Sequence, residues 1–323
     1  MSSLSYQALT SAAGFVELVD WSCIEVSGAD RAKFLHNMCT NDVLGLTPGQ
    51  GCEAFFTDVK AHILAHALVT SREESLVLTR SAAQAADLIG HLDRYVIRED
   101  VQIYDRKSDV RYLFISAANV GDKLSGLAAN AIHLDQSSAP LARTPAEIGG
   151  VSCALIRFPI AEPPAWLIEC PRIAVAQVGD QLAAAGVTRC DREAWEAVRI
   201  ENGFPLDRID ITEQNLPQEI ARNQQAISFK KGCYLGQETV ARIDALGHVN
   251  QTLVGIKFAG EVVPPRETPL VVDEKSVGKI ISACYSPHYE APLALALVRR
   301  GHDTPGSRLQ SEFGEAEVVA VGR

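Results

Sequence analysis

One segment of the chain places a cysteine between two glycines, directly after two lysines. Glycines permit a tight turn and a close approach of the backbone to a ligand. If a helix follows, Cys233 lies near its amino end, where free amide groups and the lysine ammonium groups favour a thiolate. The alternative is an inert, buried cysteine in a loop that merely needs glycines. The segment consists of Lys230, Lys231, Gly232, Cys233, Tyr234, Leu235, Gly236, Gln237 and Glu238.

This segment is locally basic in an acidic protein. Residues 219–242 carry four basic and two acidic side chains, whereas the whole chain has 30 Lys and Arg against 40 Asp and Glu, a net charge of −10. A local excess of positive charge suits a small ligand that bears a carboxylate.

Two acidic and two shorter polar side chains are further candidates for ligand binding. Glu201 ends a predicted helix, where the helix dipole disfavours a carboxylate. It can accept two parallel N–H bonds from a heterocycle, and Glu219 has the same capacity. Asn41 and Asp42 follow another helix and either line a cleft or form a turn. The alternative for both glutamates is an ordinary solvated acid.

The sequence argues against several other kinds of site. His62 and His66 are four residues apart, but the alternating pattern predicts a strand, which separates them by about 13 Å and disfavours a metal site. The eight cysteines include no CxxC pair, which argues against a zinc knuckle or a ferredoxin-type cluster. No dinucleotide-binding, P-loop or GxSxG motif is present.

Composition and length limit the class of protein. The 323 residues predict about two domains, or three small ones. The acidic balance argues against general nucleic-acid binding and against adhesion to an anionic membrane. We find no run apolar enough for a membrane span and no signal peptide in the first sixteen residues. With cysteines typical of a reducing compartment, the sequence predicts a cytoplasmic protein.

The hydrophobic pattern predicts a mixed α+β region up to about residue 190. The order of one strand, a helix, several strands, a helix and a strand occurs twice, which indicates a weak structural repeat. Residues 135–150, rich in Ser, Ala, Pro and Gly, are predicted as a surface loop. Helices are predicted from a capping-box-like start at Ser27–Asp30 and over 82–97, 119–131, 171–186 and 191–202. Strands are predicted over 21–26, 52–57, 62–70, 75–79, 101–104, 110–116, 151–158 and 166–170.

The character of the chain changes after about residue 248. Short β-type runs alternate there with Gly and Pro, which predicts a small antiparallel barrel or sandwich. These runs cover residues 252–258, 269–272, 277–284, 293–299 and 316–321.

The segment Lys231–Glu238 resembles the signature of the YgfZ family of folate-binding proteins, which are relatives of the glycine-cleavage T-protein. The resemblance extends over most of the chain, and the β-rich tail is similar to the carboxy-terminal barrel of these proteins. Further matching segments are Val26–Asp30, Phe34–Leu35, Thr40–Val43, Gly49–Gln50 and Arg199–Gly203.

The resemblance implies a fold and a ligand. The implied fold has three domains around a central channel, with two interleaved α+β lobes in residues 1–247, an internal boundary near residue 110, and a β-barrel in 248–323. The implied ligand is tetrahydrofolate or a one-carbon derivative. Glu201 matches the glutamate that recognises the pterin, Glu219 matches a second acid, and Arg242 is a looser candidate for the glutamate tail. Asn41 and Asp42 are expected near the pterin.

The resemblance also implies a role in the assembly or repair of iron–sulfur clusters, with cluster client or assembly proteins as partners and Cys233 as the motif cysteine. One cysteine cannot hold a cluster alone, so any contact with a cluster is shared or transient. We expect Glu201 and Cys233 to face one common channel.

One departure from the T-protein pattern separates the possible functions. The catalytic Asp-Asp-Leu segment of the T-protein falls on Ala65, His66 and Ala67, and its pterin-stacking tyrosine falls near Asp207. Without a positioned carboxylate, aminomethyl transfer is the weaker hypothesis. The open alternatives are a folate-dependent aminomethyl- or methyltransferase and a non-catalytic scaffold that binds partner proteins.

Overall fold

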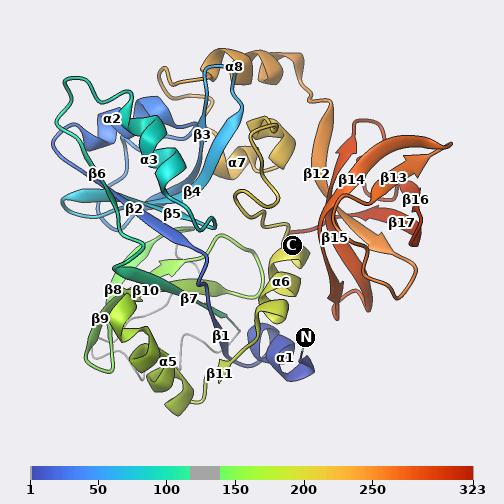
Figure 1. Ribbon diagram of the computed structural model, residues 1–323, viewed down its shortest axis with the longest axis horizontal. Helices are drawn as coiled ribbons and strands as arrows, with labels where there is room; N and C mark the ends of the chain where they lie inside the picture. The colour runs from blue at the N-terminus through green and yellow to red at the C-terminus, as the bar shows by residue number, and fades with distance from the viewer. Residues whose placement is uncertain (1, 117–138, 323) are drawn as a thin grey trace.

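The computed structural model describes residues 2–116 and 139–322. Two sheet-containing lobes lie on one side of the molecule and a closed barrel on the other (Figure 1). The predicted α+β class and the predicted carboxy-terminal barrel are both confirmed. The predicted helix at 119–131 and the start of the predicted loop at 135–150 lie outside the described residues.

The first lobe contains a five-stranded antiparallel sheet in the order β3-β4-β5-β2-β6. Its strands are mostly buried because helices cover one face and the second lobe packs on the other. The strands are β2 (Ser22–Ser27), β3 (Gly51–Thr57), β4 (Ile63–Ser71), β5 (Ser75–Arg80) and β6 (Gln102–Asp105). The helices are α2 (Arg31–Met38) and α3 (Ala86–Asp93).

The second lobe contains a six-stranded sheet in the order β11-β1-β7-β10-β9-β8. Among the described strands of this sheet, only the pair β1 and β11 is parallel. The strands are β1 (Gly14–Glu17), β7 (Val110–Ser116), β8 (Arg143–Ile148), β9 (Val151–Arg157), β10 (Ala165–Pro171) and β11 (Thr188–Arg189). The helices are α1 (Ser3–Thr10), the short η1 (Arg172–Ala174), α5 (Val175–Ala184) and α6 (Arg192–Glu201).

The two sheets share one topology. The order β3-β4-β5-β2-β6 of the first sheet corresponds strand by strand to β8-β9-β10-β7-β11 of the second, with β1 inserted between β7 and β11. The predicted structural repeat is therefore confirmed. The insertion of β1 was not predicted, because a four-residue strand carries almost no periodic signal.

The barrel closes in the order β12-β15-β14-β13-β16-β17, and closure leaves no free sheet edge. A register shift between Ile280 and Ser282 bends the long strand β14 around the barrel. Helix α8 (Gln237–Leu246) and the short segments η2 (Pro217–Ile220) and α7 (Asn223–Ala226) connect the lobes to it. The barrel strands are β12 (Gln251–Phe258), β13 (Pro269–Val272), β14 (Lys275–Ser286), β15 (Ala291–Arg299), β16 (Arg308–Ser311) and β17 (Gly314–Val319).

Three local predictions were wrong. Residues 143–148 form β8 rather than a loop, because pairing with β9 supplies hydrogen bonds that the Pro- and Ala-containing sequence does not indicate. The helix predicted over 82–97 is limited to Ala86–Asp93. The expected capping box before α2 is absent, because the Asp30 carboxylate accepts its bond from the distant Asp100 amide instead.

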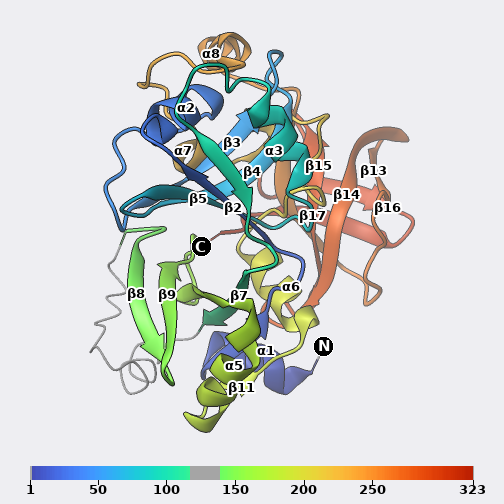
Figure 2. The same cartoon turned by 60° about the vertical axis from the view of Figure 1, so that its left-hand side comes forward.

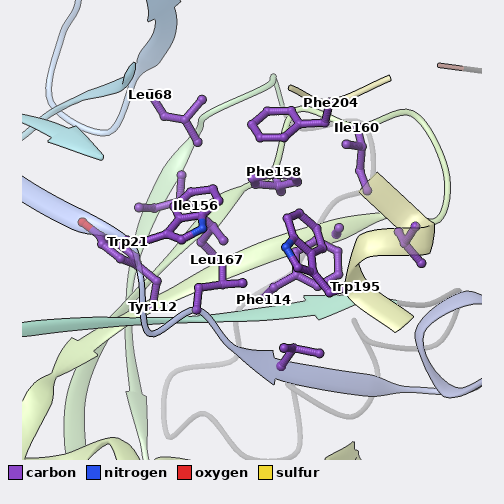
Figure 3. Packing of buried hydrophobic residues seen from close by; sticks show 14 of the residues in the cluster. Trp21, Leu68, Tyr112, Phe114, Ile156, Phe158, Ile160, Leu167, Trp195 and Phe204 are labelled. Atoms are coloured by element: carbon purple, nitrogen blue, oxygen red, sulfur yellow. The ribbon is translucent and has the colours of Figure 1, made fainter. Parts of the chain in front are cut away.

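A cluster of aromatic side chains joins the two lobes (Figure 3). Phe158 lies at its centre, with its ring centroid 4.7 Å from that of Phe204 and 5.6 Å from that of Trp195. Leu68 and Val77 reach into the same cluster from the first sheet. Because both lobes contribute, burial of these rings stabilises the arrangement of the lobes as well as each lobe.

Phe158→Ala is expected to lower the free energy of unfolding by about 3–5 kcal/mol, since it removes a fully buried ring and leaves a cavity. Urea unfolding followed by circular dichroism measures this change. Ile173→Ala is the control, because Ile173 is 97% exposed and its removal should change stability by about 0.5 kcal/mol or less. Equal effects of the two substitutions would contradict the central role of Phe158.

Candidate functional site

Helix α6 positions Glu201 at its last residue. The helix begins where the Asp191 carboxylate accepts a hydrogen bond of 2.8 Å from the Ala194 amide, and Gly203 follows its end with a φ of +63°. Both boundaries were predicted and are confirmed. One face of α6 is buried around Trp195 and Val198, which holds the helix between the second lobe and the barrel (Figure 1, Figure 2).

The Glu201 carboxylate is held by hydroxyl groups from two other elements. Tyr6 of α1 donates to its oxygens at 3.0 and 2.9 Å, and Ser286 of β14 donates to Oε1. Burial and the charge of Glu201 raise the pKa of Tyr6, so that its hydroxyl stays protonated and remains a donor. These bonds fix the orientation of the Glu201 carboxylate. Its oxygens can still accept further hydrogen bonds from a ligand.

Glu201 lines a cavity of about 180 Å³ together with Tyr6, Asn202, His288 and Tyr289. Sites for drug-sized ligands have volumes of about 300–1,000 Å³, so this cavity suits one ring system rather than a long molecule. Asn202 also lines a neighbouring cavity of about 320 Å³ that runs along the barrel. The two cavities therefore lie next to each other at the junction between the lobes and the barrel.

Glu219 is buried and serves the protein itself. Its Oε2 accepts bonds of 3.2 Å from the Asn215 side chain, the Leu216 amide and the Gln251 side chain. These bonds join η2 to the start of β12. Glu219 is not among the residues that line the cavity at Glu201.

The cysteine motif is anchored to the first lobe, at the end of α2. The buried Lys231 ammonium donates to the carbonyl oxygens of His36, of Cys39 at 2.7 Å and of Asn41 at 2.9 Å. This arrangement caps the carboxyl end of α2 with a cation, as the helix dipole favours. The Leu235 amide also donates to the same helix, at the Asn37 carbonyl, at 3.0 Å.

Gly236 completes the anchoring of the motif. It adopts a φ of +85°, and a Cβ at this position would lie 2.6 Å from the Asp58 carbonyl oxygen. Only glycine fits such a close approach in this conformation. Gly236 thus permits a close approach of the backbone to the first lobe, whereas the predicted approach of the motif glycines to a ligand stays a prediction.

Cys233 itself is exposed, which contradicts the alternative of a buried, inert cysteine. Helix α8 begins only at Gln237, so the expected position of Cys233 at the amino end of this helix is wrong. Lys231 is bound by carbonyls of α2 rather than directed to the thiol. Lys230 and Glu238, at the two ends of the motif, are exposed, as is Arg242 of α8.

The other motif positions form the support of the loop. Tyr234 is buried with the Lys231 ammonium 4.8 Å from its ring centroid, Gln237 is half-buried, and the Leu235 carbonyl accepts a 2.7 Å bond from Thr57. Each of these contacts is made with the first lobe or within the motif.

Asn41 and Asp42 lie after α2, where the motif is anchored, and neither lines the cavity at Glu201. Asn41 donates to the carbonyls of Glu53 and Gln225 at 2.8 Å, and its carbonyl holds Lys231. Asp42 Oδ1 accepts a 3.1 Å bond from the Leu44 amide, as in the turn that was the alternative interpretation. Their expected contact with the pterin stays a prediction, since the hydrogen bonds of both residues are made with protein groups.

The structure does not bring Cys233 to the cavity at Glu201, which no motif residue lines. The expectation of one channel shared by Glu201 and Cys233 fails for this cavity. The physical reason is the anchoring of the motif to α2, whereas Glu201 is held by α1 and β14. There are two candidate sites, an acid site at the end of α6 and a thiol site at the end of α2.

Sequence reasoning missed two features near these sites. His36 of α2 is buried, with its Nδ1 3.2 Å from Asp42 Oδ1. A polar residue between the apolar neighbours Leu35 and Met38 was the available signal. The second feature is a buried ionic group in which the Glu53 carboxylate binds Arg222 and, at 3.0 Å, His66.

The two histidines at 62 and 66 pair with different acids. His66 is paired with Glu53, and His62 lies 3.3 Å from the Asp58 carboxylate. Within residues 2–116 and 139–322, no group of three or more His, Cys, Asp or Glu side chains is arranged to hold a metal ion. No helix in the same ranges is long and apolar enough to cross a membrane.

Comparison with known proteins identifies the family. Residues 3–231 match the model of the GCVT N-terminal domain, and residues 251–321 match that of the glycine cleavage T-protein C-terminal barrel domain. The chain belongs to the glycine cleavage T-protein family. The resemblance predicted from the motif is thereby confirmed.

Individual relatives of the chain are more distant. The tRNA-modifying protein YgfZ of Colwellia psychrerythraea is 25% identical over 92% of this chain and 89% of its own length. An Arabidopsis thaliana chloroplast protein named as a transferase is 28% identical over 83% of the chain, and the match spans only 61% of that relative. The glycine cleavage aminomethyltransferase T of Bartonella henselae has the same fold, with a TM-score of 0.85 at 18% identity, over 98% of this chain and 88% of that one.

The buried ionic group predicts a loss of stability in acid. Burial alone would raise the pKa of Glu53, but the charge of Arg222 and the bonds from His66 and Arg222 lower it to about 2. A lowered folded-state pKa stabilises the protein fully above the unfolded value of about 4.5, and this stabilisation is lost as the pH falls toward 2. The contribution is about 3 kcal/mol at most.

We expect the free energy of unfolding of the wild type to fall between about pH 5 and about pH 3, and to fall less steeply in Glu53→Gln. Urea titrations at several pH values measure both slopes. The exposed Glu312→Gln serves as a control and should keep the wild-type slope. Identical slopes for Glu53→Gln and the wild type would contradict this role of Glu53.

Proposed function

We propose that this chain binds a reduced folate, tetrahydrofolate or a one-carbon derivative, with the pteridine ring beside Glu201. The observation that carries the proposal is the Glu201 carboxylate, which is fixed by Tyr6 and Ser286 at the wall of a ring-sized cavity. A pteridine presents an amino group beside a ring N–H, and a carboxylate accepts both bonds in parallel. Membership of the T-protein family supports this ligand.

We place the remainder of the folate in the neighbouring cavity of about 320 Å³ along the barrel. The neighbouring cavity shares Asn202 with the first and includes the Arg222 side chain. The cavity of about 180 Å³ at Glu201 is too small to hold the aminobenzoyl group and the glutamate tail as well as the pteridine. We propose that both groups extend into the neighbouring cavity. Arg242 and Glu219, which the family resemblance implied as further contacts, do not line either cavity.

We further propose that the bound folate accompanies a role in the assembly or repair of iron–sulfur clusters, in which Cys233 is the reactive group. Its thiol is exposed, whereas the other seven cysteines are buried or half-buried. One thiolate cannot hold a cluster, so a client or assembly protein supplies the remaining ligands. This role is the one that the resemblance of the motif to the YgfZ family implies, whereas the relatives with that name are described as tRNA-modifying proteins.

Aminomethyl transfer is less well supported. At the positions implied for the T-protein catalytic segment stand Ala65, His66 and Ala67. The nearby carboxylate of Glu53 is already bound by Arg222 and His66. A carboxylate in a buried ion pair is a poor general base or electrostatic partner for a bound amine. Turnover of an aminomethyl folate by the purified protein would favour the transferase instead.

Glu201→Gln is expected to weaken tetrahydrofolate binding about tenfold or more, because one of two acceptors for the pteridine becomes a donor. Anaerobic titration calorimetry of the full chain measures the affinity. Glu162→Gln is the matched control, since Glu162 is an exposed acid at the rim of the same cavity and should retain affinity within about twofold. Unchanged affinity in Glu201→Gln would refute the assignment.

Cys233→Ser is expected to abolish the support of cluster enzymes while leaving tetrahydrofolate binding unchanged, because the two sites are separate. The readout is the recovery of activity of an oxidised [4Fe–4S] enzyme in extracts of cells that carry only the variant. Cys190→Ser, at a half-buried thiol of the second lobe, is the control and should behave as wild type. Full recovery with Cys233→Ser would instead indicate a non-catalytic scaffold.

A further inference from the structure

A third cavity lies where the last turn of α8 meets η2, α7 and the barrel. Its volume of about 680 Å³ is within the range of small-molecule sites. It shares Ala221 and Asp303 with the cavity of about 320 Å³ along the barrel. None of the described residues that line it lines the cavity at Glu201. It is therefore separate from the place proposed for the pteridine.

Two buried amide oxygens belong to residues that line this cavity. Gln218 is 7% exposed, and its Nε2 donates to the Val240 carbonyl at 2.7 Å, which makes Oε1 the acceptor of this amide. Asn223 also lines the cavity, and its Oδ1 is buried. Neither oxygen accepts a hydrogen bond from any group in residues 2–116 and 139–322. Because a buried acceptor without a donor is unfavourable, a ligand with N–H groups is favoured here.

The charged groups of the cavity favour a cation. Asp244 of α8 and Asp303 of the loop between β15 and β16 both line it, and the Asp303 Oδ1 is oriented by a 3.1 Å bond from the Gly301 amide. Arg300 lines the same cavity. In the part of the chain that the structure describes, neither carboxylate forms an ion pair with Arg300 or with another cation. The two carboxylates are thus available to a positively charged ligand.

The carboxyl end of α8 adds to this preference. Its last turn includes Asp244 and has no basic residue. The carbonyl groups at the end of a helix carry a partial negative charge, which stabilises a nearby cation. His248 lines the cavity with its Nδ1 3.0 Å from the Leu246 carbonyl. Since a carbonyl oxygen only accepts, this nitrogen carries a proton and donates to the helix end.

We propose that this cavity binds a small organic cation with several N–H donors, a guanidinium or primary ammonium compound. Its N–H groups donate to Oε1 of Gln218 and Oδ1 of Asn223. The carboxylates of Asp244 and Asp303 balance its charge. A metal ion is disfavoured, since no group of three or more His, Cys, Asp or Glu side chains in the described residues is arranged to hold one. This site is additional to the proposed function and depends on neither folate nor Cys233.

The test is titration calorimetry of the full chain at about 150 mM salt, which screens weak surface attraction. The probes are agmatine, with a guanidinium and an ammonium group, and putrescine, with two ammonium groups. We expect saturable binding of at least one of them, together with a higher melting temperature in its presence. The neutral diol with the carbon chain of putrescine is the ligand control. No binding of either amine, or equal binding of the diol, would overturn the proposal.

Substitutions then locate the binding. Asp244→Asn and Asp303→Asn should each weaken binding of the tighter probe about tenfold or more, because each removes a charged acceptor. Glu312→Gln is the matched control, since it removes one negative charge from an exposed acid of the barrel outside the cavity and should retain affinity within about twofold. Wild-type affinity in both aspartate variants would place the amine elsewhere and overturn the assignment.

Gln218→Met tests the amide acceptor and should also weaken binding. Because this side chain is buried and bonded to Val240, its melting temperature is measured first. If the variant unfolds, the aspartate variants decide the question, since Asp244 is exposed and Asp303 is half-buried. Tighter binding of acetyl-arginine amide than of agmatine would indicate the side chain of a partner protein and overturn the assignment to a small molecule. These titrations contain no folate, so a failure of the proposed function is seen separately.

Discussion

The buried ammonium of Lys231 determines where the most distinctive segment of this protein lies. A desolvated lysine is costly unless its donors are used, and three backbone carbonyls at the end of α2 use them. The same contact satisfies carbonyl groups that every helix end leaves unpaired. These hydrogen bonds satisfy both the ammonium and the carbonyl groups. They fix the loop that carries Cys233 to the first lobe and so determine the position of the thiol.

The acid site depends on a different principle. A carboxylate at a helix end has no local partner, and Glu201 finds its donors in Tyr6 and Ser286, from the amino-terminal helix and the barrel. The orientation of the Glu201 side chain is therefore fixed only when α1, α6 and the barrel are packed together. Buried ion pairs reinforce the same junction, since Arg199 binds Asp210 at 2.6 Å and Ser282 of the barrel binds the same acid. A ligand in the cavity at Glu201 contacts α1, the second lobe and the barrel.

The separation of the two sites has a consequence for how the protein works. Under the proposed function, a folate beside Glu201 and a partner at the exposed thiol would occupy different places, since no motif residue lines the cavity at Glu201. Any influence of one on the other must pass through the packed lobes, where the aromatic cluster and the pair of Glu53 and Arg222 connect the elements.

The amino-acid sequence by itself determined the local features. The Asp191 cap and Gly203 predicted both ends of α6, alternating apolar residues predicted most strands of both lobes and the barrel, and the motif around Cys233 indicated the family. These features depend on interactions between residues a few positions apart, which a sequence shows directly. The strand at 143–148 was missed because it is stabilised by pairing with a neighbouring strand, which the local sequence does not show. Only the tertiary structure decided which polar groups meet. Lys231 and His36 are 195 positions apart, and nothing in residue type or spacing tells that an ammonium prefers those carbonyls to the adjacent thiol. Such pairings arise from the burial of whole elements against each other, and this is why Glu201 and Cys233, expected together, lie apart.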